Sequence, residues 1–455
     1  MNATTKNPDT AFLGHPKGLG YIVFTEAWER FSFYGMQALM VLYMSTYLFQ
    51  HGTIEGIYGF SQYKAFIESI FGELSIRALS TQTFGLYIGF IYFMPVIGGL
   101  IGDQWLGQRK AVLAGAVAMA IGHFLMAFEA AFLFAMLSLI IGSGLLKGNL
   151  AAQVGTLYTK NDQRRDTAFS IYNVAVNVGA TIAPLICGTL GELYGWHYGF
   201  GAAGIGMMIG IAVYVSGAKY LPDVVTEKNP DGSDGLQAGD TAKIGMLVLL
   251  FIITALFWIA QTQVWNTYPL WIKDHVDLEI FGTSMPITWF QSLDSFAVLV
   301  FAPIIMYLWY KQRQRSAEPE DVTKIIIGFL VFGAACVWLA VGQTLSADGK
   351  VAIFWPAIFH FICAAGFLYA WPAVMAMVSK TAPAPVNAMM VGACYLSIFA
   401  GSTTSGWLGR FYETLPATTF WIMHGAIVAS AGGFIFLIRK PLAKILELET
   451  KNSKL

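Results

Sequence analysis

The sequence is poor in charged residues. Asp, Glu, Lys and Arg make up 12% of its 455 residues, whereas about a quarter is usual for a soluble globular chain. Hydrophobic residues supply 56%, which predicts that lipid surrounds most of the chain. The 27 basic and 27 acidic residues balance, so no global field is expected to recruit nucleic acid.

Cysteine is scarce as well, and its spacing is uninformative. Cys187, Cys336, Cys363 and Cys394 all lie in apolar runs, which argues against a disulfide framework or a metal site. The chain has no Walker A sequence, so nothing supports ATP as a driving force. The apolar stretches also show no nucleophile–base pair and no metal-ligand spacing. We therefore expect no cofactor and no enzymatic activity.

Apolar stretches of the roughly 20 residues needed to cross a bilayer recur along the chain. Twelve are predicted, at residues 18–48, 82–102, 110–128, 131–157, 168–190, 198–221, 244–271, 285–310, 324–345, 351–378, 387–409 and 418–438. The polar, turn-forming segment 222–243 divides them six and six. The predicted fold is therefore an all-α membrane protein with two six-helix bundles, residues 1–221 and 244–455, joined by a linker at 222–243.

Basic residues mark alternate connections between these stretches. They follow the second, fourth, eighth and last spans, as Arg109, Lys110, Lys160, Arg164, Arg165, Lys311, Arg313, Arg315, Arg439 and Lys440. The positive-inside rule then predicts a multi-pass protein of the cell membrane with both termini and the linker in the cytoplasm. Segment 50–81 would be extracellular, and its mixed polar and apolar spacing leaves an amphipathic helix and an ordered loop both open.

Three charged residues lie inside the first span. Glu26, Glu29 and Arg30 fall 8 to 12 residues into it, and each central charge costs at least about 2.5–3.5 kcal/mol in lipid. They must therefore pair or face water. Glu26 and Arg30 share a helix face, while the two nearby carboxylates repel, which raises the proton affinity of one of them.

Two further charges are predicted inside other spans. Lys147 has no acidic neighbour on its own helix, so the carboxylates of the first span are its nearest candidate partners, and the glycines around it favour close helix approach. Asp294 is the counterpart in the second half. These five residues give three acids and two bases, and the excess carboxylate predicts a proton-binding site; static ion pairs between helices remain the alternative. His123, His360 and His424 are expected to pack rather than to relay protons.

A short glycine-rich turn separates the second and third spans. In residues 98–110, Asp103 is followed by Arg109 and Lys110, at the position expected for the major facilitator signature. We interpret these three residues as a gating motif.

Several motifs resemble those of the proton-dependent oligopeptide transporter family of the major facilitator superfamily. Residues 26–36 (EAWERFSFYGM) resemble the family's ExxERFSYYGM motif, and 92–95, 144–149 and 169–179 fit other family motifs. The resemblance implies that Glu26 and Glu29 are linked to protons. It also implies that Arg30 and Lys147 alternate between those acids and a substrate carboxylate, with Tyr34, Tyr92 and Asn177 lining the site.

The second half departs from the family pattern. Residues 258–263 (WIAQTQ) lack the family's acid, and Phe367 stands where the family has a glutamate before a proline. Gln37 replaces a family arginine that helps to hold carboxylates, and Cys394 replaces a tryptophan. Asp294 lies where the family usually has asparagine, so it is a candidate either for receiving a substrate amino group or for a second protonation.

The sequence thus predicts a proton-coupled symporter that imports a small carboxylate-bearing solute, with di- or tripeptides or a peptide-like compound as the first guess. A transporter of a non-peptide carboxylate and a drug or metabolite exporter of the same fold remain open, as does a receptor without transport activity. The expected partners are the substrate, protons and the lipid bilayer, and the functional unit is expected to be a monomer.

Overall fold

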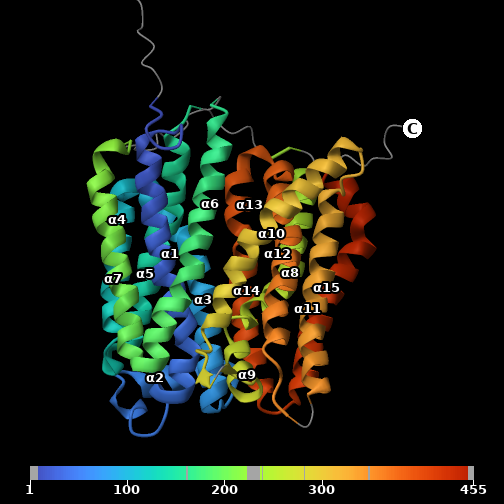
Figure 1. The fold of residues 1–455 in the computed structure, drawn as a ribbon. Coiled ribbons are helices and arrows are strands. Elements are labelled where there is room, and N and C mark those ends of the chain that lie inside the picture. Colours follow the sequence, from blue (N-terminus) through green and yellow to red (C-terminus); the bar gives the residue numbers. More distant parts are fainter. Residues whose placement is uncertain are drawn as a thin grey trace, which may run out of the picture. The chain divides into compact units, whose positions relative to one another are not determined.

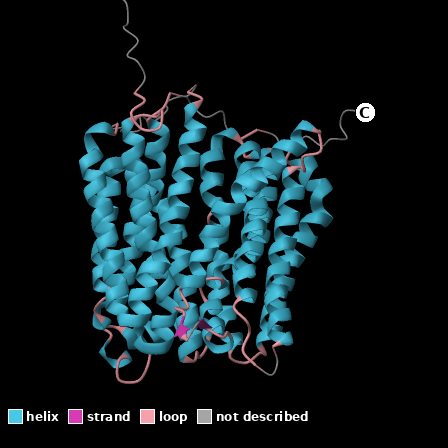
Figure 2. Ribbon diagram, viewed as in Figure 1, coloured by secondary structure: helices cyan, strands magenta, loops and turns pink. Residues whose placement is uncertain are grey.

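The computed structural model describes residues 9–159, 162–222, 236–237, 239–280, 282–346 and 349–448. Nearly all of this part of the chain is helical (Figure 2). The helices of the first half are α1 (Lys17–Tyr43), α2 (Phe60–Phe71), α3 (Ile76–Ile101), α4 (Gln108–Leu125), α5 (Phe132–Thr156), α6 (Arg164–Ala183) and α7 (Trp196–Gly217). Those of the second half are α8 (Asp240–Gln263), α9 (Thr267–His275), α10 (Trp289–Gln314), α11 (Asp321–Leu345), α12 (Phe354–Thr381), α13 (Asn387–Cys394), α14 (Leu396–Leu408) and α15 (Ala417–Ile445) (Figure 1).

All twelve predicted spans are helical in the described residues. Two of them are broken: α8 and α9 together form the span predicted at 244–271, and α13 and α14 form the span predicted at 387–409. Ten stretches among the described residues are long and apolar enough to cross a membrane by composition alone. The helices α1 and α4 are not among the ten, because charged residues lower their apolar character.

Two short elements complete the fold. Segment 50–81 contains the helix α2, so the helical alternative holds there; its Phe60 and Ile67 are buried, while Phe66 and Ile70 are exposed. The all-helical prediction missed a small antiparallel hairpin, β1 (Glu279–Ile280) and β2 (Thr283–Ser284). Strands of two residues are too short to show the alternation that identifies a strand in a sequence.

The chain forms two compact units that differ from the two halves of the sequence. Unit 1 comprises Met1–Met36 and Met94–Lys228, and unit 2 comprises Gln37–Phe93 and Asn229–Leu455. Thus α1 and α3 each contribute to both units. Most of the predicted linker at 222–243 lies outside the described residues.

Small residues allow close helix packing in unit 1. A Cβ on Gly115 of α4 would lie 2.6 Å from the carbonyl oxygen of Gly142 of α5, and one on Gly142 would lie 2.7 Å from that of Gly115. A Cβ on Gly98 of α3 would likewise collide with the carbonyl oxygen of Gly144 of α5. Side chains at these positions would separate the helices, so the glycines fix the position of α5, which carries Lys147.

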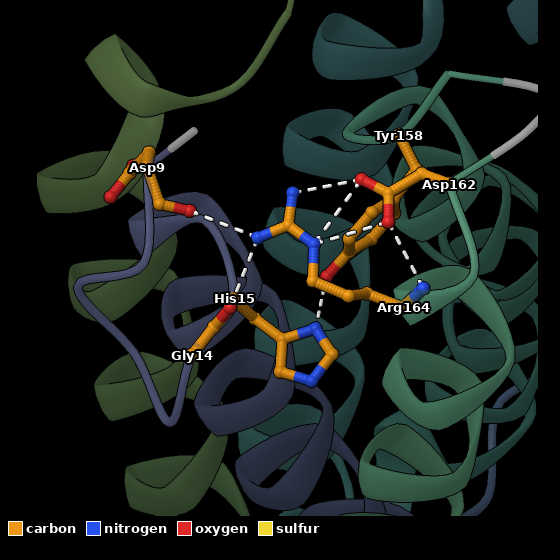
Figure 3. Close-up of polar contacts among 6 residues, drawn as sticks. All are labelled: Asp9, Gly14, His15, Tyr158, Asp162 and Arg164. Carbon is orange, nitrogen blue, oxygen red and sulfur yellow. Dashed lines mark hydrogen bonds and ion pairs between the residues drawn. The ribbon is translucent and has the colours of Figure 1, made fainter. Parts of the chain in front are cut away.

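Arg164 ties the segment before α1 to the start of α6 (Figure 3). Its guanidinium donates to the carbonyl oxygen of Gly14 at 3.0 Å and to the Asp162 carboxylate at 2.8 Å. These hydrogen bonds to Asp162 lower the pKa of its carboxyl group. Beside them, Nδ1 of His15 lies 2.8 Å from the hydroxyl oxygen of Tyr158, so the chain before α1 is held at two points.

In unit 2, the start of α3 is joined to α9 by an ion pair. The two terminal nitrogens of Arg77 donate to the two carboxylate oxygens of Asp274 at 2.7 and 3.3 Å, and the Tyr412 hydroxyl donates to the same carboxylate at 3.2 Å. Close backbone contacts support this junction, because Asn266 donates to the Thr81 carbonyl oxygen at 3.1 Å. The bidentate geometry is the most specific that an arginine and a carboxylate adopt.

Replacing Arg77 with alanine is expected to destabilise unit 2 by about 1 kcal/mol, because the pair is partly exposed and solvent screens it. Thermal unfolding in detergent measures the effect. The charge-swapped double variant Arg77→Asp/Asp274→Arg is expected to recover part of the loss. Lys64→Ala, which breaks a similarly exposed ion pair with Glu68 on α2, is a matched control. Equal losses in Arg77→Ala and Lys64→Ala would contradict a special role for the junction.

A second ionic network joins α10 to α11. The Glu318 carboxylate accepts hydrogen bonds from Arg313 at 2.6 Å and from Lys324 at 2.7 Å. The bond from Arg313, followed by that from Lys324, lowers the pKa of Glu318 to about 2. The network lines a polar cleft of about 800 Å³ whose wall also includes Lys243 and Lys380.

The lowered pKa of Glu318 gives its contribution to stability a definite pH dependence. A carboxylate whose pKa falls on folding stabilises the protein above its unfolded pKa, and loses this effect as the pH falls through the folded pKa. Glu318→Gln is therefore expected to lower the melting temperature by a few degrees at pH 6–7, and the difference from wild type should vanish between about pH 4.5 and pH 2. A difference that stayed constant over that window would rule out this ionisation as its cause.

Candidate functional site

The charged cluster of the first span lies within unit 1. Nε of Arg30 lies 2.8 Å from a carboxylate oxygen of Glu26 and 2.6 Å from one of Glu29. Glu26 is 2% exposed, Glu29 0% and Arg30 7%. The spacings i,i+4 and i,i+1 along α1 bring both acids to one guanidinium, which compensates part of the cost of burying them.

Lys147 of α5 belongs to the same cluster. Its Nζ lies 3.8 Å from the centre of the Phe33 ring, a cation–π distance, and Glu29, Glu26 and Arg30 are its electrostatic neighbours. The sequence therefore named the correct neighbours of Lys147. It did not single out Phe33, although this residue lies inside the motif, because an aromatic residue in an apolar helix is usually a packing residue.

The helix α6 forms another wall of the cluster. A Cβ on its Gly179 would collide with the Ala27 carbonyl oxygen and lie 3.1 Å from Cβ of Arg30, so glycine permits this approach. Tyr172 is buried next to Glu26 and Arg30. Asn177 is partly exposed and donates to the Asn173 carbonyl oxygen at 2.9 Å.

The remaining predicted substrate residues fall partly in unit 2. Tyr34 is partly exposed next to Arg30 in unit 1. Gln37 is 5% exposed, and within the described chain no group bonds its amide oxygen. Tyr92 faces Trp258 of α8, with ring centres 6.5 Å apart. Asp294 of α10 accepts a hydrogen bond from the Trp265 indole at 3.2 Å.

Aromatic rings cluster in unit 2 around Phe367, which stands where the family has a glutamate. Trp258 packs edge-to-face against Trp371 at 5.0 Å and against Phe367 at 6.3 Å. Trp371 in turn meets Tyr395 at 5.8 Å. This wall of unit 2 is therefore apolar and aromatic.

The predicted gating motif lies at a sharp turn in unit 1. The helix α3 continues as a π-helix, Gly102–Leu106, and Gly107 turns the chain with φ +76° before α4 begins. Asp103 is exposed and accepts a weak hydrogen bond from Gln108 at 3.5 Å. Arg109 and Lys110 lie in the first turn of α4. The predicted turn is present, while gating by these residues stays a prediction.

Among the histidines and cysteines, His360 departs from the packing role that the sequence favours. His360 of α12, for which the sequence favoured a packing role, lies 3.8 Å from the Asp294 carboxylate. His424 is held in the core by the Phe420 carbonyl oxygen at 2.9 Å and by Gln263 at 3.1 Å. The four cysteines are free and buried. Among the described residues, no three His, Cys, Asp or Glu side chains are grouped to hold a metal ion.

Solved structures share this fold over nearly the whole chain. A crystal structure of a peptide transporter POT in complex with sulfate matches with a TM-score of 0.84 and 27% identity, covering 96% of this chain and 97% of the other. A POT family transporter in complex with 5-aminolevulinic acid matches with a TM-score of 0.83 and 26% identity, covering 96% and 98%. The fold and its buried charges define a multi-pass membrane transporter with the major facilitator fold.

Sequence comparisons identify the family. The uncharacterized transporter YclF of Bacillus subtilis (strain 168) is 28% identical, covering 97% of both chains. The di-/tripeptide transporter of Lactococcus lactis subsp. cremoris is 26% identical, covering 98% of this chain and 99% of the relative. The model of the POT family matches residues 109–237 and 236–422, and the chain belongs to that family.

Proposed function

We propose that this protein is a proton-coupled symporter that imports small solutes carrying a carboxylate, with di- and tripeptides and peptide-like compounds as the first candidates. The observation that carries the proposal is the buried cluster of Glu26, Glu29, Arg30 and Lys147. Relatives described as di-/tripeptide transporters, and a family structure with bound 5-aminolevulinic acid, support this range of substrates.

The cluster offers a direct way to couple the two fluxes. Arg30 is shared by two carboxylates, and Lys147 lies close to both. A substrate carboxylate that binds Arg30 or Lys147 competes with Glu26 and Glu29 for these cations. The carboxylate that loses its partner is buried without compensation and binds a proton. Substrate and proton therefore occupy the site together.

The aromatic rings around Phe367 in unit 2 bear on which charged groups of a substrate the protein can bind. Phe367 and the rings that pack against it carry no charge, so Arg30 and Lys147 are the proposed source of most of the polar binding energy for a substrate carboxylate. Tyr34, Tyr92, Asn177 and Gln37 are proposed to line the site. The same apolar wall is the observation that favours an exporter of apolar metabolites as the second candidate. We also propose cytoplasmic termini and a monomeric functional unit.

Uptake into proteoliposomes under an imposed inward proton gradient tests the proposal. Dipeptides, single amino acids, 5-aminolevulinate and simple carboxylates are compared in parallel. Accumulation above the external concentration that collapses with a protonophore is the expected result. The absence of gradient-driven accumulation of any of these solutes would refute symport, and extrusion of apolar compounds instead would favour the exporter.

A further inference from the structure

An Asp–His pair lies in unit 2, and the side chain of its aspartate is 17% exposed. Asp294 of α10 and His360 of α12 approach to 3.8 Å between carboxylate oxygen and Nδ1, and the His360 side chain is fully buried. Neither ring nitrogen of His360 forms a hydrogen bond with any described group. One helical turn before Asp294, Gln291 is also fully buried, and its amide is unbonded within the described chain. Among the described residues, Asp294 thus has one unbonded polar side chain, His360, beside it and another, Gln291, one helical turn before it.

The Asp294 carboxylate has no basic partner of the usual kind. Within the described residues, no lysine or arginine nitrogen lies within 4.0 Å of it, and His360 is its ion-pair partner. The groups that face the pair are the Trp265 indole between α8 and α9, the Tyr268 ring of α9 at 5.1 Å from the His360 ring, and the thiol of Cys363 on α12. Cys336 of α11 neighbours Cys363 and is the next titratable group.

These surroundings determine how the pair binds protons. Without a proton, the carboxylate and a neutral imidazole carry a net charge of −1 on a side chain that is only 17% exposed, so the carboxylate has lost much of its hydration. With one proton shared between them, the pair is neutral overall, either as a carboxylate beside an imidazolium or as a carboxylic acid beside an imidazole.

We infer that Asp294 and His360 together form a proton-binding site in unit 2, distinct from the Glu26–Glu29 cluster of unit 1. It supplies this unit with an ionisable group although Phe367 and residues 258–263 lack the family's acids. The Trp265 indole, in the break between α8 and α9, donates to the charged carboxylate and holds it less firmly once it is protonated. Protonation of the pair therefore weakens the attachment of the break that precedes α9, the helix that carries Asp274.

This inference rests on the proposed symport, so wild-type protein is measured first. The proton-to-substrate ratio is determined in proteoliposomes from the membrane potential that halts net flux of a transported dipeptide at a fixed pH gradient. Asp294→Asn and His360→Gln are then compared with His123→Gln, which replaces a buried histidine of unit 1. Both pair variants are expected to transport about one proton fewer per substrate, with the His123 variant unchanged.

The outcomes separate the two proposals. Lack of gradient-driven uptake by wild-type protein overturns the proposed symport, whereas wild-type ratios in both pair variants overturn the second proton site alone. If a folded Asp294→Asn variant transports about one proton fewer per substrate and retains counterflow, the proton site is supported. Loss of counterflow as well assigns Asp294 to substrate binding instead and refutes the inference.

A spectroscopic measurement covers the case in which a variant does not fold. Infrared difference spectra of purified wild-type protein between pH 5 and pH 8 report protonated carboxyl groups directly. The conservative variant Asp294→Glu is expected to shift one carboxyl band, and His360→Gln to move the pH at which that band appears. Spectra identical to wild type in both variants would show that Asp294 does not titrate in this range.

Discussion

Replacing Glu26 with glutamine is expected to abolish proton-driven accumulation while sparing counterflow. The glutamine side chain keeps the size of glutamate but removes the charge that lies 2.8 Å from Nε of Arg30. Substrate exchange requires only that the site binds and reorients, whereas uphill uptake requires a carboxylate that binds a proton when the substrate arrives. Accumulation in proteoliposomes is expected to fall to the level of equilibration, with counterflow close to wild type.

The matched control is Glu129→Gln, which makes the same chemical change in unit 1, at a glutamate that lies near His197 and is remote from the cluster. It should accumulate substrate like wild type. Uphill uptake retained by Glu26→Gln would remove Glu26 from the coupling mechanism, and Glu29 would become the remaining candidate within the cluster.

Replacing Lys147 with glutamine is expected to lower kcat/KM by about 10- to 100-fold. The variant loses a charge-assisted interaction with the substrate carboxylate, worth about 1.5–3 kcal/mol. It also leaves two buried acids against a single base, so the resting cluster gains a net negative charge that opposes an anionic group. Initial uptake rates over a range of substrate concentrations measure the effect, which should appear mainly in KM.

Phe33→Leu separates the position of the Lys147 ammonium from its charge. Leucine keeps the apolar packing but removes the ring 3.8 Å from Nζ, a cation–π interaction worth about 0.5–2 kcal/mol. We expect a smaller loss than for Lys147→Gln, and Phe33→Tyr should stay close to wild type because its ring is retained. Equal activity of the leucine variant and wild type would mean that the ring does not position Lys147.

The sequence predicted most of the fold because lipid imposes simple rules. A span must be apolar for about 20 residues, so all twelve helical spans could be located, and buried charges stand out against that background. Glu26, Glu29, Arg30 and Lys147 were predicted to be neighbours because each is too costly to bury alone.

Other features depend on tertiary contacts that leave no periodic signal. The breaks at residues 264–266 and at Tyr395 do not interrupt the apolar stretches. The sequence therefore predicted each broken helix as one span. Phe33, Tyr172 and His360 belong to residue types that usually pack, and only the structure shows which charges they contact. The assignment of residues 37–93 to unit 2 follows from contacts such as that of Asn266 with Thr81, which join segments far apart in the chain.

Pro95 lies inside α3, next to the boundary at Phe93 and Met94 where this helix passes from unit 2 to unit 1. Proline has no backbone N–H, so the carbonyl oxygen of Ile91 lacks its regular helical hydrogen bond at this point. The bending stiffness of α3 is therefore reduced close to the point where the helix passes from one unit to the other. A change of curvature at Pro95 therefore changes the direction of the turns that follow it, which carry Gly98 and its close contact with Gly144 of α5.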